Sequence, residues 1–154
     1  MDGELYSVKD VAALIGATKG ESQARIMRQV RHWTQHDLLH PVTGKSTGTG
    51  TSRLYDAHAV RCAVILHEFA RYGIPLINLD GFDEWTDAVS QDPRWKAAIT
   101  GKREVFITMA WVADGGSAWG FAADEPTLTA FRSDQGFSSA IVINLTRLFS
   151  RLDL

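Results

Sequence analysis

The sequence is poor in the features that define several common classes of protein. Its one cysteine, Cys62, excludes an intrachain disulfide and argues against a thiolate metal cluster. Its hydrophobic runs are far shorter than the ~20 residues that cross a bilayer. The acidic start at residues 1–4 lacks the apolar core of an export signal. We therefore expect a cytoplasmic protein that makes no membrane contact.

Excess positive charge, the usual sign of a nucleic-acid-binding protein, is also missing. The 154 residues carry a formal net charge of −2, so the chain as a whole generates no basic field. The charge is uneven, however, because residues 1–79 sum to +2 and residues 80–154 sum to −4. All five histidines lie in the first part. The distribution separates a weakly basic part of the chain from an acidic one.

Two helices are predicted near the start of the chain. Ser7 followed by Asp10 is typical of a capping box that begins a short helix, and Gly16 is expected to end it. A second helix is predicted from about Glu21 or Ser22 to about residue 36. Its apolar side consists of Ile26, Val30 and Trp33. Its opposite side carries no acid and consists of Arg25, Arg28, Arg31, His32, Gln35 and His36.

The polar side of the second helix has two interpretations. It is either plain solvated surface or a DNA-reading surface, because Arg and Gln pair with base edges and Arg, Lys and His with phosphates. The segments that follow favour the second interpretation. They are an apolar corner at 38–41, a glycine-rich hairpin at 42–52 containing Lys45, a return strand at 53–55, and a helix at 56–72 followed by a shorter one at 74–79. This order is the layout of a winged helix-turn-helix.

Residues 6–79 resemble the DNA-binding domain of MerR-type transcription regulators. The matching segments are Tyr6-Ser7-Val8-Lys9-Asp10-Val11-Ala12 with Gly16, Leu38-Leu39-His40-Pro41, Arg53-Leu54-Tyr55, and Tyr72-Gly73-Ile74-Pro75-Leu76. Two departures from the family are visible. The segment from Lys19 to Gln29 is longer than the compact family form, and no long dimerising helix follows Leu79.

The resemblance implies that the second helix enters the major groove and that the wing contacts the flanking backbone. It assigns groove or phosphate contacts to Arg28, Arg31 and His32, and backbone contacts to Lys45 and Arg53. Tyr55 is either a backbone contact or a core residue. The full set that we expect to face DNA is Lys19, Arg25, Arg28, Arg31, His32, Gln35, Lys45, Arg53 and Tyr55.

The second half changes from helical to alternating hydrophobic periodicity. Strands are predicted at 104–113, 118–123, 128–131 and 139–145, with turns between them and a final helix that Thr146 begins. The expected fold is α+β: an N-terminal winged helix-turn-helix, then a small antiparallel sheet with a C-terminal helix. We place the domains at 1–79 and 103–154, joined by a helical connector at 80–102 that Asp92-Pro93 interrupts.

The final helix and the aromatic residues of the second half each allow two roles. One side of the helix carries Leu145, Leu148, Phe149 and Leu152, which either fold back on the sheet or form a dimer contact. The aromatic residues Trp111, Trp119, Phe121, Phe131 and Phe137 are either core or a pocket for a small-molecule effector.

No catalytic, metal or cofactor site is expected. Gly44-Lys45-Ser46 lacks the upstream glycine and the strand–helix context of a phosphate-binding loop. His32, His36 and His40 are spaced by four, but the apolar corner at 38–41 indicates that the helix has ended before His40. Cys62 lies on an apolar helical stripe and is expected in the core.

The sequence therefore predicts a non-enzymatic transcription regulator that binds a palindromic site on double-stranded DNA as a homodimer. One alternative is an excisionase-like architectural factor that bends DNA. Another is a ligand-sensing or protein-interaction module that does not bind DNA.

Overall fold

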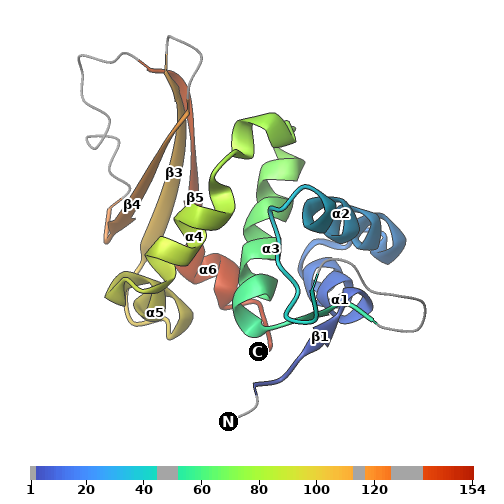
Figure 1. Ribbon diagram of the computed structural model, residues 1–154. Helices are drawn as coiled ribbons and strands as arrows, with labels where there is room; N and C mark the ends of the chain where they lie inside the picture. Colours follow the sequence, from blue (N-terminus) through green and yellow to red (C-terminus); the bar gives the residue numbers. More distant parts are fainter. Residues whose placement is uncertain (1–2, 45–51, 113–116, 126–136) are drawn as a thin grey trace. The chain divides into compact units, whose positions relative to one another are not determined.

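The computed structural model describes residues 3–44, 52–112, 117–125 and 137–154. The chain has a mixed α+β fold in which N-terminal helices are followed by a three-stranded antiparallel sheet packed with a C-terminal helix (Figure 1). It divides into two compact units, Met1–Thr86 with Leu152–Leu154, and Asp87–Arg151. The division falls inside the segment that the sequence marks as a connector. No helix in the described parts is long and apolar enough to cross a membrane.

The first unit is a helical bundle with a two-stranded sheet. Its elements are β1 (Tyr6–Ser7), α1 (Val8–Lys19), α2 (Gln23–Gln35), β2 (Leu54–Tyr55), α3 (Ala57–Arg71) and the 3-10 helix η1 (Leu76–Leu79). Helix α1 packs against both α2 and α3. The largest fully buried side chains of this unit include Trp33, Tyr55, Phe69 and Phe82. The edge-to-face pair of Phe69 and Phe82, with ring centroids 6.4 Å apart, extends this core to the start of α4 (Phe82–Ser90).

The helix starts follow the predicted capping chemistry in two of three cases. Ser7 and Asp10 form the capping box at α1, and the side chain of Asp56 accepts the amide of Ala59 at 2.8 Å to cap α3. Ser22 is the N-cap of α2 but makes no side-chain capping bond.

The end of α1 corrects the prediction at Gly16. The helix continues to Lys19 and ends at Gly20, whose φ of 66° is the left-handed conformation that glycine adopts without strain. Gly16 instead allows a close helix approach, because a Cβ there would lie 3.4 Å from the Ile26 side chain. Residues 17–19 therefore belong to the helix, and the connection to α2 is shorter than an end at Gly16 would make it.

The second unit is a small sheet with helices. Its strands are β3 (Val105–Val112), β4 (Ser117–Ala123) and β5 (Phe137–Asn144), and its helices are α5 (Pro93–Ile99) and α6 (Leu145–Phe149), together with the end of α4. Strand β3 lies in the centre and pairs antiparallel with both neighbours, with Ile107 opposite Phe121 on β4 and Ile143 on β5. The strand predicted at 128–131 lies outside the described residues.

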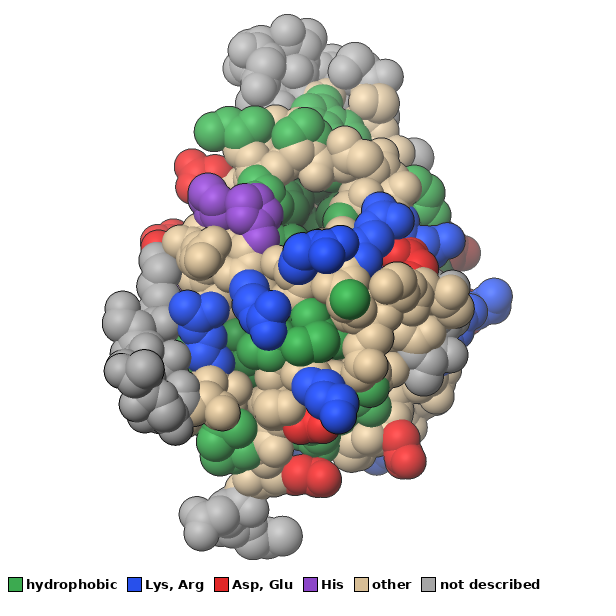
Figure 2. Space-filling view, turned by 90° about the vertical axis from the view of Figure 1, so that its right-hand side faces the viewer, with side chains coloured by type: hydrophobic (Ala, Val, Ile, Leu, Met, Phe, Trp, Pro, Cys, Tyr) green, Lys and Arg blue, Asp and Glu red, His purple; other side chains and the backbone are tan. Residues whose placement is uncertain are grey.

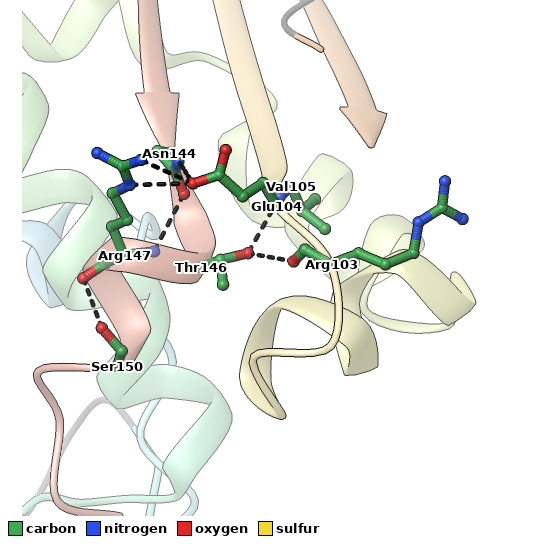
Figure 3. A network of polar contacts seen from close by, with 7 residues as sticks. All are labelled: Arg103, Glu104, Val105, Asn144, Thr146, Arg147 and Ser150. Carbon is green, nitrogen blue, oxygen red and sulfur yellow. Dashed lines mark hydrogen bonds and ion pairs between the residues drawn. The ribbon is translucent and has the colours of Figure 1, made fainter. Parts of the chain in front are cut away.

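Helix α6 is held to the sheet by a polar network. Asn144, not Thr146, caps the helix, since its side chain accepts the Arg147 amide at 3.0 Å. Thr146 lies within the helix, where its hydroxyl donates to the Arg103 carbonyl at 2.7 Å and accepts the Val105 amide at 3.0 Å (Figure 3). The helix therefore begins two residues before the position that a cap at Thr146 predicts, and Thr146 fixes it to the start of β3.

Candidate nucleic-acid interface

Helix α2 exposes the side that the sequence predicts. Ile26, Val30, Trp33 and Thr34 are buried. The exposed residues are Arg25, Arg28, Arg31, His32, Gln35 and His36. Figure 2 shows Lys and Arg side chains spread across the middle of one face of the molecule, with histidine side chains beside them. The two histidines of α2 meet edge to face, with ring centroids 4.4 Å apart.

The cations of this face differ in how far they are neutralised. Arg25 lies 3.9 Å from the carboxylate of Glu21, and its side chain is 63% exposed. An exposed pair at this distance contributes little to stability. Within the described parts of the chain, the guanidinium groups of Arg28 and Arg31 have no ion-pair or hydrogen-bond partner. Their charges are available to an anion from outside the chain.

Tyr55 lies in the core, which decides between the two roles left open for it. Its side chain is fully buried, and its hydroxyl lies 2.8 Å from the Thr34 hydroxyl. Thr34 in turn donates to the Val30 carbonyl at 3.0 Å, so Tyr55 is the donor to Thr34. Burial raises the pKa of the Tyr55 phenol, against the opposing effects of its hydrogen bond with Thr34 and of the nearby guanidinium groups of Arg53 and Arg31. Tyr55 thus joins β2 to the last turn of α2.

The segments on either side of residues 45–51, where the sequence predicts a wing, are joined by hydrogen bonds. The Val42 amide donates to the Leu54 carbonyl at 2.8 Å. The Thr43 hydroxyl accepts the Leu54 amide at 3.0 Å and donates to the Ser52 carbonyl at 3.3 Å. On its other side the return strand pairs with β1, with Tyr55 opposite Tyr6 and Leu54 opposite Ser7. This register brings the start of α1 beside residue 53.

A surface hollow lies where α1, α2 and the wing base meet. It is lined by Ser7, Val8, Lys9, Met27, Arg31, Ser52 and Arg53. Three of these residues are cations from three different elements, and none is acidic. We call this set, Lys9, Arg31 and Arg53 with Ser7 and Ser52, the wing-base hollow. Lysine and arginine cations gathered from neighbouring segments suit a phosphate group, whereas the Ser7 hydroxyl already donates to the Asp10 carboxylate at 2.7 Å.

Lys9 is absent from the residues that the sequence singles out. Its position after the capping serine marks it only as a helix residue. The pairing of Tyr6 with Tyr55 brings it beside the wing. From the sequence, the place of Lys9 beside the wing could have been inferred only by aligning β1 and β2 at Tyr6 and Tyr55.

Two predicted contacts cannot be placed. The backbone of Lys19 ends α1, but its side chain is not described, and Lys45 lies outside the described residues.

The predicted dimer residues Leu145, Leu148 and Phe149 are buried, and Phe149 packs against Trp95 with ring centroids 5.2 Å apart. Of the two roles considered for α6, this arrangement favours folding back within the chain. Leu152 lies beyond the end of the helix.

The histidines do not assemble a metal site in the described residues. Helix α2 ends at Gln35, so His40 lies beyond its end. The Nε2 of His40 lies 3.2 Å from the Asp83 carboxylate. No group of three His, Cys, Asp or Glu side chains in the described segments could hold a metal ion.

Neither the comparison with models of protein families nor the comparison with curated proteins finds a match for this chain. The functional assignment therefore depends on the residue pattern and on the geometry of α2 and the wing-base hollow.

Proposed function

We propose that this protein is a sequence-specific DNA-binding transcription regulator of the winged helix-turn-helix type, similar to the MerR class. The observation that carries the proposal is a set of cations from neighbouring segments. The exposed, acid-free side of α2 extends through Arg31 into the wing-base hollow, where Lys9 and Arg53 join it. A plain solvated helix face would not require cations from two further elements at its side.

The two parts of this surface suit different parts of the duplex. Helix α2 has 13 residues and is therefore ~20 Å long. The major groove, about 12 Å wide, admits a helix. Arg28 and Gln35 are placed to read guanine and adenine edges, whereas Arg31, Lys9 and Arg53 are placed to hold one flanking phosphate.

The proposal includes a homodimer, because a two-fold dimer matches a palindromic operator. We place this complex in the cytoplasm. No chemical step is needed for the role, so we assign no catalytic residue.

Selection of bound sequences from a random duplex pool tests the proposal most directly. The selected duplex and a scrambled duplex of equal composition are then titrated at salt concentrations from about 50 to about 200 mM. We expect a palindromic consensus, tighter binding to the selected duplex, and an affinity that falls steeply with salt because phosphate contacts release counterions. Absence of binding at the lowest salt concentration would refute the proposal.

A further inference from the structure

A buried polar cluster connects α3 to both the start and the middle of α2. His67 of α3 is 1% exposed. Its Nδ1 lies 3.3 Å from Oε1 of Gln29, which is next to Arg28 on α2. Its Nε2 lies 3.2 Å from Oε1 of Glu21, which precedes the N-cap of α2. One rigid ring therefore bridges two points, eight positions apart in the sequence, on the proposed recognition segment.

Glu21 is the centre of the charges around this ring. Arg71 Nε, from α3, lies 3.8 Å from the same Glu21 oxygen that faces His67. Arg71 also donates to Glu68 at 3.0 Å. Arg25 approaches the other oxygen of Glu21 from α2. The carboxylate of Glu21 is thus held by groups from both helices.

The protonation of His67 determines how the ring can bond. Burial lowers the pKa of the His67 imidazole, against the opposing effect of Glu21 and Glu68. A neutral ring has one donor and one acceptor nitrogen, and a carboxylate only accepts. Nε2 therefore carries the hydrogen and faces the Glu21 carboxylate. The distance between Nε2 and Glu21 Oε1 suits a hydrogen bond, but the angle in the structure does not. A half-turn of the Gln29 amide exchanges its oxygen and nitrogen and lets Nδ1 accept.

The start of α2 needs this support more than the other helix starts do. Helices α1 and α3 are fixed by the side chains of Ser7 and Asp56. Ser22 makes no such bond at α2. Besides the Glu21 contacts, the Gln23 side chain donates to the Lys9 carbonyl at 3.1 Å, but this bond is exposed. The His67 contact is more shielded from water, since the His67 side chain is 1% and the Glu21 side chain 21% exposed, and an electrostatic attraction is stronger where water is excluded.

We propose that His67 is a positioning residue that holds the start and the middle of α2 against α3 and so sets the pose of the DNA-facing side chains. The inference rests on the proposed function for its effect on DNA. Its local part, the fixing of the start of α2, holds independently of any ligand.

Two substitutions separate the two contacts of the ring. His67→Gln places a polar group near the position of Nε2 and can keep the Glu21 contact. His67→Asn places one near Nδ1 and loses it. Val60→Ala, in the buried side of α3, removes core volume without touching the cluster and controls for a general loss of stability.

Amide hydrogen exchange provides the readout that does not depend on DNA. We expect His67→Asn to speed exchange in the first turn of α2 more than Val60→Ala does, and His67→Gln to restore slow exchange. Equal exchange in the first turn for His67→Asn and wild type would overturn the positioning role. If Val60→Ala produced the same local change, the effect would be general destabilisation and the proposal would again fail.

Titration of the selected and scrambled duplexes provides the second readout. We expect His67→Asn to reduce the preference for the selected duplex about tenfold, which corresponds to about 1.4 kcal/mol. The salt dependence should not change, because no cation is removed. An unchanged preference, together with faster exchange, would overturn the link to DNA reading. If the wild-type protein bound no duplex, the proposed function itself would fail, whereas the exchange result would still decide the local part.

Discussion

Helices α2 and α6 are both amphipathic, and the sequence predicts a DNA contact for α2 and, as one of two roles, a dimer contact for α6. The chain itself provides partners for the side chains of α6, but not for all the cations of α2 in the described residues. On α6, Arg147 lies 3.0 Å from Glu104, which also accepts from the Asn144 side chain (Figure 3). The apolar residue Phe149 is covered by Trp95. On α2, the apolar side is covered in the same way, but Arg28 and Arg31 have no acidic partner in the described parts of the chain.

The difference separates a helix that completes a fold from one that offers a surface. The second unit also pairs Arg94 with Asp92 at 2.6 Å and Arg103 with Asp124. Acidic partners are thus used where arginine has a structural position. In the described parts of the chain, Arg28 and Arg31 of α2 lack such a partner, whereas Arg25 has Glu21. The charge of Arg28 and Arg31 stays accessible, and it suits an external polyanion.

The largest expected effect tests α6, the helix whose side chains have their partners within the chain. Phe149→Ala removes a buried ring from the second unit and should lower the free energy of unfolding by about 3–5 kcal/mol. Val142→Ala, at a side chain that is 40% exposed on β5, is the matched control and should cost much less. Urea unfolding at two protein concentrations measures both. If the loss at Phe149 grew with protein concentration, the ring would lie in a dimer contact rather than within the chain.

The next largest effect tests α2, on which Arg28 and Arg31 have no acidic partner in the described parts of the chain. Arg28→Ala or Arg31→Ala should weaken binding of the selected duplex by about 1–3 kcal/mol if the residue pairs with a base. Arg147→Ala removes an equal charge from α6 and should change binding little. A uniform loss on all duplexes, with a smaller salt dependence, would assign the arginine to a phosphate. Equal effects of Arg28→Ala and Arg147→Ala would remove the distinction between the two helices.

Much of the first unit follows from the sequence because its signals are local. The i, i+3, i+4 spacing around Val30 and the cap at Asp56 each determine nearby backbone, and the structure contains the corresponding helices. The exposed side of α2 follows in the same way. Most of the hairpin predicted at 42–52 lies outside the described residues. The error at Gly16 arises because glycine is also used where two helices approach closely, and that use depends on Ile26 in another helix.

Long-range contacts explain what the sequence could not indicate. Lys9 reaches the wing-base hollow only through the register of β1 and β2. His67 reaches Glu21 and Gln29 only through the packing of α3 beside α2. The local sequence predicts that Thr146 caps a helix, but its hydroxyl instead bonds to the Arg103 carbonyl and the Val105 amide at the start of β3.

Acid should weaken the first unit before the second. The lowered pKa of His67 means that its neutral form stabilises the fold fully above its ordinary value of 6.5, and that stability falls as pH drops from there toward the lowered value. One group contributes at most about 1.4 kcal/mol per pH unit. The Asp92 carboxyl, beside Arg94, has its pKa lowered to about 2 from 3.8, so its contribution is lost only below pH 3.8.

Amide hydrogen exchange tests whether the first unit loses stability before the second. It is measured separately for the two units between pH 7 and about pH 4.5. The protection of amides in the first unit, which is their exchange rate corrected for the slower intrinsic exchange at lower pH, should fall on acidification, and His67→Gln should remove that pH dependence. Groups that face His67 are Glu21, Glu68, Arg71 and Gln29. A parallel loss of protection in both units, or no effect of His67→Gln, would show that this histidine does not set the acid response.

The smallest expected effect separates structure from recognition at Tyr55. Tyr55→Phe removes the hydroxyl that donates to Thr34, while Thr34 keeps its own bond to the Val30 carbonyl. The loss should therefore be about 0.5–1.5 kcal/mol in the free energy of unfolding. Affinity for DNA and its salt dependence should stay close to wild type at temperatures where the variant is folded, because the ring is buried and touches no phosphate. Weaker binding of DNA with unchanged stability would place Tyr55 on the DNA-facing surface instead, and would mean that the wing opens when DNA binds.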